Sequence, residues 1–134
     1  MNKHLRHATA ARLYQATDVT AAADDMPGRR VELAFSAILE ALARARQAAA
    51  AGDPSVRGVQ TSRALRLIGL LRASLDHAAA PELSGNLEAL YGYCTRRLLD
   101  AALGDTAALP DVIGVIQKLQ SGWTGAMSTL RAAA

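Results

Sequence analysis

The stretch AAAAGDPS, residues 48–55, decides the fold of this chain because it ends one helix and begins the next. Gly52 suits the first position after a helix, where a left-handed backbone conformation is common. Asp53 suits the N-cap of the following helix, and Pro54 suits its first turn. A connection this short predicts that the two flanking helices run antiparallel.

Similar boundaries divide the rest of the chain. Gly104 and Asp105 separate two helical stretches, and Pro81 follows an alanine run that ends another. These boundaries predict long helices at about 29–51, 55–79, 82–103 and 106–131, and a short helix at about 4–15. The sequence therefore predicts an all-α fold, an antiparallel up-down four-helix bundle with a short extra N-terminal helix.

The composition fits a single helical domain. About half (51%) of the 134 residues are hydrophobic, and alanine and leucine, which lead the helix scale, supply most of them. We expect residues 1–134 to form one helical-bundle domain. Within it, residues 1–26 are expected to be an N-terminal helix and flexible tether, and residues 27–131 the bundle.

Each long helix carries an apolar stripe at helical spacing. The last helix has the clearest stripe, which steps by three and four residues from Leu109 to Leu130. The second has the widest, which covers well over half of its circumference. Its members are Leu65, Leu67, Ile68, Leu70, Leu71 and Leu75. A helix this apolar is either central in the bundle or faces a partner outside the chain.

Charge and hydropathy argue against several classes of protein. The net charge is +3, but the arginines are spread along the chain with no run longer than two, so we expect no nucleic-acid partner. No stretch approaches the roughly 20 apolar residues of a membrane span, and the N-terminus lacks the apolar core of a signal peptide. We expect a cytoplasmic protein without stable membrane insertion.

The residues that carry chemistry form no recognisable active site. His4 and His7 lie one helical turn apart, but no carboxylate or thiol nearby completes a metal site. Cys94, the only cysteine, lies in an apolar stripe, which favours a small buried residue over a nucleophile. We therefore expect no catalytic residue, metal or cofactor, and no enzymatic activity.

Residues 86–99, NLEALYGYCTRRLL, resemble the signature of the flagellar secretion chaperones, the FliS family. Residues 63–76, RALRLIGLLRASLD, resemble the helix that precedes this signature in the family. Further matches in the same order are Tyr14-Gln15, Ala48 to Asp53, Ala101, Leu103 and Trp123. The sequence departs from the family pattern at residues 33–37, LAFSA, and at Gly92 and Ala102.

The resemblance implies a cytoplasmic export chaperone for flagellin. Such a chaperone binds the disordered C-terminal segment of flagellin, prevents premature polymerisation and delivers the client to the flagellar type III export apparatus. Flagellin is then the expected partner, and the flagellar export-gate protein is an additional candidate. The binding mode implied is an amphipathic client helix in an apolar groove, folded on binding.

The same resemblance gives candidate binding residues. Residues two apart on a helix point about 200° apart, so Tyr91 is expected to face inward and Tyr93 a groove edge. Leu13 and Tyr14 are the expected N-terminal latch, which covers the groove when no client is present. The partner-binding candidates are Ile68, Leu71, Leu75, Leu90, Tyr91, Tyr93 and Leu98.

Two other functions stay open at this point. One is a histidine-phosphotransfer four-helix bundle with His77 as the phosphate acceptor, although the lysine and small residues usual around such a histidine are missing. The other is a self-associating helical interaction module, such as a homodimer formed through the apolar second helix.

Overall fold

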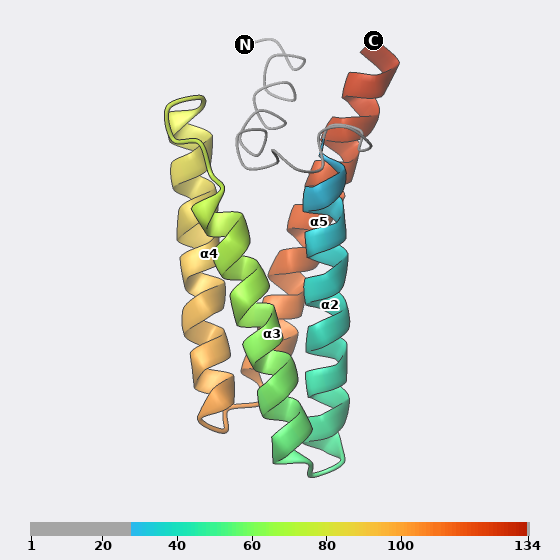
Figure 1. Cartoon of the computed structure of the whole chain (residues 1–134), viewed down its shortest axis with the longest axis vertical. Coiled ribbons are helices and arrows are strands. Elements are labelled where there is room, and N and C mark those ends of the chain that lie inside the picture. The colour runs from blue at the N-terminus through green and yellow to red at the C-terminus, as the bar shows by residue number, and fades with distance from the viewer. Residues whose placement is uncertain (1–27, 134) are drawn as a thin grey trace.

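The structure is a computed structural model that describes residues 28–133, and this range contains four helices. They are α2 (Arg29–Ala50), α3 (Pro54–Ala73), α4 (Pro81–Ala102) and α5 (Ala108–Ala133), and no strand occurs among the described residues. Successive helices run in opposite directions, as the all-α, up-down prediction requires (Figure 1). The predicted helix at about 4–15, with the latch residues Leu13 and Tyr14, lies outside the described residues.

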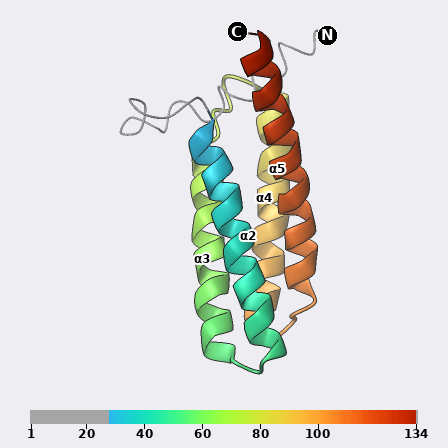
Figure 2. The same cartoon turned by 90° about the vertical axis from the view of Figure 1, so that its right-hand side faces the viewer.

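The four helices surround one core. Each packs against its neighbour in sequence, and α5 closes the ring against α2, with the most extensive contact between α2 and α3. Figure 2 shows α2 and α5 from the side, with α5 rising past the start of α2. The largest side chains that are completely buried come from all four helices and include Leu42, Ile68, Tyr91, Leu98 and Ile116. This arrangement is consistent with a four-helix bundle.

The corner between α2 and α3 has the structure that AAAAGDPS predicts. Gly52 has a φ of 70°, in the left-handed region that glycine adopts without strain. The Oδ1 atom of Asp53 accepts a hydrogen bond from the backbone N–H of Val56 at 3.1 Å, which satisfies one free donor at the start of α3. Pro54 occupies the first turn of α3.

The corner between α3 and α4 differs from the prediction, since α3 ends at Ala73 instead of about residue 79. The hydroxyl of Ser74 donates to the carbonyl oxygen of Leu71 at 2.9 Å. The Oδ1 atom of Asp76 accepts from the backbone N–H groups of Ala78 at 3.0 Å and Ala79 at 3.2 Å. The side chains of Ser74 and Asp76 thus form hydrogen bonds with backbone groups that would otherwise pair within a helix. The alanine run therefore forms a turn despite its helix propensity.

The corner between α4 and α5 is organised by Arg97. Its Nη1 lies 3.0 Å from Asp100 Oδ2 and 3.2 Å from Asp105 Oδ2, and its Nη2 lies 2.8 Å from Asp111 Oδ2. These hydrogen bonds, the one to Asp111 first, raise the pKa of Arg97. One guanidinium thus joins the end of α4, the loop and the first turn of α5.

The start of α2 packs tightly against α5. Gly28 has a φ of 86°, and the Nε1 of Trp123 donates to its carbonyl oxygen at 3.2 Å. A Cβ atom at Gly28 would lie 2.5 Å from Met127 Sδ and 2.6 Å from Trp123 Cζ2. Only glycine therefore allows this approach of the two helices.

Candidate partner-binding surface

Exposed apolar side chains gather on two helices of the bundle. Among the described side chains, the large hydrophobic residues that are exposed are Leu33, Val56, Val59, Leu70, Leu90, Tyr93, Leu99 and Leu103. All except Leu33 lie on α3, on α4 or, for Leu103, at the residue directly after α4. Because well-packed single chains bury such side chains where they can, this distribution indicates that α3 and α4 present a surface to a partner.

The outer face of α3 is both apolar and basic. A shallow depression of about 450 Å³ is lined by Arg63, Arg66, Leu67, Gly69 and Leu70. Leu70 is 67% exposed, so the wide apolar arc of this helix does face outward as well as inward. Residues 54–75 contain four arginines and no acidic residue, which favours a partner segment that carries carboxylates.

Helix α4 presents two exposed apolar pairs on different faces. Leu90 and Tyr93 are three residues apart and each is 38% exposed, whereas Leu99 and Leu103 lie four apart on another side. Tyr91 is completely buried, as the spacing of the two tyrosines predicts. The phenol of Tyr93 offers an apolar ring and a polar hydroxyl at the surface, which suits an interface.

The seven candidate binding residues divide into two groups in this structure. Leu90 and Tyr93 are exposed, and the other five are buried in the core. The buried members are Ile68, Leu71, Leu75, Tyr91 and Leu98. The buried five hold the bundle together, and a partner reaches them only where helices separate, so a binding role for the seven stays a prediction.

Sequence reasoning did not choose the three most exposed leucines on or directly after α3 and α4. Leu70, Leu99 and Leu103 are exposed by 67%, 50% and 89%. A signal for them exists in the sequence, because each is displaced around its helix from the core stripe. Leu70 follows the buried Ile68 by two residues, and Leu99 follows the buried Leu98 by one.

The surroundings of Cys94 and His77, the two titratable residues considered as chemical candidates, fit structural roles. Burial raises the pKa of the Cys94 thiol to about 11, so the reactive thiolate is disfavoured. His77, the alternative phosphate acceptor, lies in the corner between α3 and α4. Its Nδ1 is 3.2 Å from Ser84 Oγ, and its Nε2 is 3.5 Å from Glu88 Oε2. Both contacts join the corner to α4.

Metal-binding clusters and membrane-spanning helices are two further features that residues 28–133 lack. These residues contain no group of three or more histidine, cysteine, aspartate or glutamate side chains that could hold a metal ion. None of the four described helices combines the length and apolarity needed to cross a membrane.

An antiparallel helical bundle with exposed apolar and basic side chains on two neighbouring helices is typical of a protein-binding module. The family model described as "Flagellar protein FliS" matches residues 7–130. This chain therefore belongs to the FliS family, as residues 63–76 and 86–99 predicted.

Characterised relatives agree with this assignment. The "Flagellar secretion chaperone FliSB" of Pseudomonas aeruginosa is 36% identical over 118 residues, which cover 87% of this chain and 94% of that protein. The "Flagellar secretion chaperone FliS" of Salmonella typhimurium is 35% identical over 99 residues, 72% of this chain and 73% of that protein. The protein of the same description from Escherichia coli is 37% identical over 95 residues, 69% and 70% of the two chains.

Proposed function

We propose that this protein is a cytoplasmic, non-enzymatic export chaperone for flagellin. It binds the disordered C-terminal segment of flagellin, prevents premature polymerisation and delivers the client to the flagellar type III export apparatus. The observation that carries the proposal is the gathering of exposed apolar residues on α3 and α4 of a bundle whose core is well packed. Membership of the FliS family, with relatives described as flagellar secretion chaperones, supports it.

The energetics of such a complex require a large apolar contact. A disordered client pays for the ordering of its backbone when it folds on the chaperone, roughly 1–2 kcal/mol for each residue. Complete burial of one leucine returns only about 2 kcal/mol. The client must therefore contact several exposed side chains at once, and Leu70, Leu90 and Tyr93 on two adjacent helices provide separate points of contact.

The N-terminal latch is part of the proposal. Leu13 and Tyr14 would cover the binding surface when no client is present, so the client must displace them. Deletion of residues 1–20 is then expected to leave the bundle folded and to raise the affinity for flagellin. Unchanged or weaker binding by the deletion variant would contradict a latch.

The test is a calorimetric titration with flagellin from the same genome, full-length and without its C-terminal segment. We expect a Kd in the micromolar range or tighter for the full-length protein, and loss of binding on truncation. Absence of binding to both forms would overturn the proposal. Light scattering in the same samples separates a one-to-one complex from self-association of the chaperone.

A further inference from the structure

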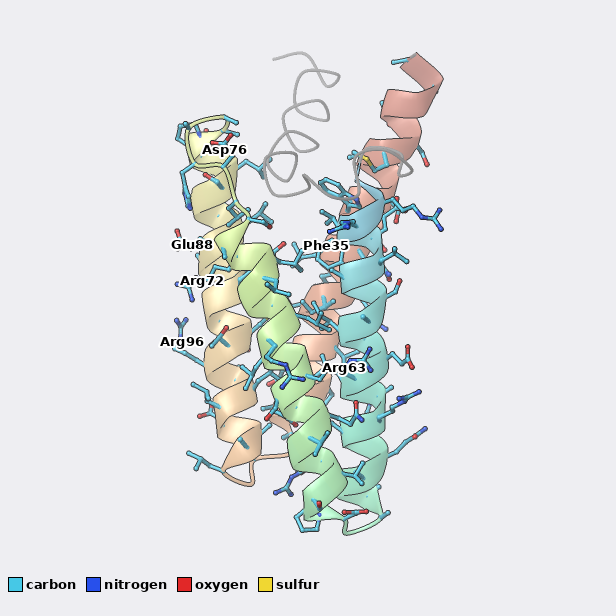
Figure 3. All side chains as sticks on the ribbon, viewed as in Figure 1. Phe35, Arg63, Arg72, Asp76, Glu88 and Arg96 are labelled. Carbon is cyan, nitrogen blue, oxygen red and sulfur yellow. The ribbon has the colours of Figure 1, made fainter. Side chains whose placement is uncertain are left out.

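Two arginine side chains from different helices converge above Gly92. A Cβ atom placed at Gly92 would lie 3.4 Å from Nη1 of Arg96 on α4. The same point is 3.9 Å from both Nη1 and Nη2 of Arg72 on α3. Figure 3 shows the two side chains with their nitrogen ends toward each other at the outer edge of the α3–α4 pair. Two guanidinium groups this close repel each other unless an anion lies between or beside them.

The described residues supply little negative charge at this point. Arg72 Nε lies 3.5 Å from Glu88 Oε1, at the outer limit of a hydrogen bond. The other oxygen of this carboxylate, Oε2, lies 3.5 Å from His77 Nε2. Within residues 28–133, Arg96 has no carboxylate partner, and the two Nη atoms of Arg72 have none either. Gly92 itself is buried, and its lack of a side chain lets both guanidinium groups approach α4 closely.

An exposed apolar stripe continues along α4 from this pair of arginines. Gly92, Arg96 and Leu99 follow each other at intervals of three or four residues, so they share one side of α4. Leu103, the C-cap of the helix, comes four residues after Leu99 and continues this side. Leu99 is 50% exposed and Leu103 is 89% exposed. The stripe runs roughly 10 Å from Arg96 to Leu103, at 1.5 Å per residue. Two turns of an amphipathic partner helix have this length.

We propose that Arg72 and Arg96 together bind an aspartate or glutamate side chain of the flagellin client, while Leu99 and Leu103 pack against apolar residues of the same client helix. The inference rests on the proposed function and names a contact within it. Each guanidinium presents its N–H groups in a planar fork that fits a carboxylate. The charge of the pair and the apolar stripe beside it together favour an acidic amphipathic segment.

The first experiment compares the affinity for full-length flagellin of the wild-type chain and of the double variant Arg72→Gln, Arg96→Gln. We expect the double variant to bind about tenfold more weakly, because a charge-assisted contact is lost. Its affinity should also fall less steeply than that of the wild type as the salt concentration rises. The matched control is Arg46→Gln on α2, an exposed arginine away from the pair, which should bind like the wild type.

The second experiment supplies the carboxylate from the chain itself. Gly92→Asp places an acid beside both guanidinium groups, and its Cβ would meet only the ends of flexible side chains, Arg96 Nη1 at 3.4 Å and the two Nη atoms of Arg72 at 3.9 Å. We expect this variant to remain folded, by circular dichroism, and to bind flagellin several-fold more weakly because its own acid competes with that of the client. Gly92→Asn has nearly the same shape without the charge and should bind close to the wild type.

The outcomes separate this contact from the general proposal. If the double variant and Gly92→Asp both bind flagellin with the affinity of the wild type, the arginine contact is overturned. The proposed chaperone function would still hold. Equal weakening by Gly92→Asp and Gly92→Asn would also overturn it, because the effect would then be steric. If the wild-type chain fails to bind flagellin, the proposed function fails and this contact with it.

Discussion

At the scale of single residues, the two tyrosines of α4 separate stability from binding. Tyr91 is completely buried in the core, and Tyr93 is 38% exposed two residues later. We expect Tyr93→Ala to weaken flagellin binding with little loss of stability. Tyr91→Ala should instead lower the free energy of unfolding by about 3 kcal/mol or more, because it leaves a large cavity. Calorimetric titration and thermal unfolding of both variants test this, and unchanged binding by Tyr93→Ala would make its role structural.

Cys94 gives a residue-level prediction about pH. Burial raises its thiol pKa from 9.0 to about 11 in the folded chain. The folded state therefore keeps a proton that the unfolded state releases above pH 9, so the free energy of unfolding should fall as the pH rises from 9 to 11. Urea denaturation across this range should show a steeper fall for the wild type than for Cys94→Ala. Parallel slopes for the two proteins would contradict it.

The binding residues were harder to predict than the fold because core and surface use the same apolar side chains. Leu98 and Leu99 are adjacent leucines, yet one is buried and the other half exposed. The sequence shows that both are apolar, but the exposed fraction depends on how far each lies around the helix from its packing neighbours. The closeness of Arg72 and Arg96, 24 positions apart, depends on the pairing of α3 with α4, which no local pattern reports.

At the scale of elements, the N-cap of α3 is the clearest local interaction that stabilises a helix end. Asp53 Oδ1 accepts from the N–H of Val56 at 3.1 Å, and nothing else at this exposed corner replaces it. Asp53→Ala should lower the free energy of unfolding by about 1 kcal/mol, whereas Asp53→Asn, which keeps the acceptor, should cost much less. Chemical denaturation of both variants measures the difference. Equal losses would mean that the charge of Asp53 matters instead of the hydrogen bond.

The same elements show why some helix ends were predicted and one was not. Gly52, Asp53 and Pro54 act through their own backbone preferences, so their effect is visible in the sequence. The end of α3 depends instead on the side chains of Ser74 and Asp76, which accept or donate hydrogen bonds only once the turn has formed. Alanine propensity alone therefore extended the predicted helix to about residue 79.

At the scale of the whole molecule, the bundle is closed by contact between its first and last described helices. Gly28 at the start of α2 lies against Trp123 and Met127 of α5, 95 residues or more along the chain. Helices α2 and α5 also pack along their length, where Gln120 Nε2 of α5 donates to Ser36 Oγ of α2 at 3.1 Å. The contact at Gly28 adds to this packing. The closure depends on a glycine at position 28.

Gly28→Ala tests this closure, and Gly52→Ala is its matched control. Both glycines have positive φ, 86° and 70°, but a Cβ at Gly52 meets nothing within 4 Å, whereas one at Gly28 would collide with Met127 and Trp123. Gly52→Ala should cost about 1 kcal/mol of stability through backbone strain alone. Gly28→Ala should cost clearly more, and it should also change the fluorescence of Trp123, the only tryptophan. Equal losses of stability with unchanged fluorescence would show that α2 and α5 are held together along their length and not at this end.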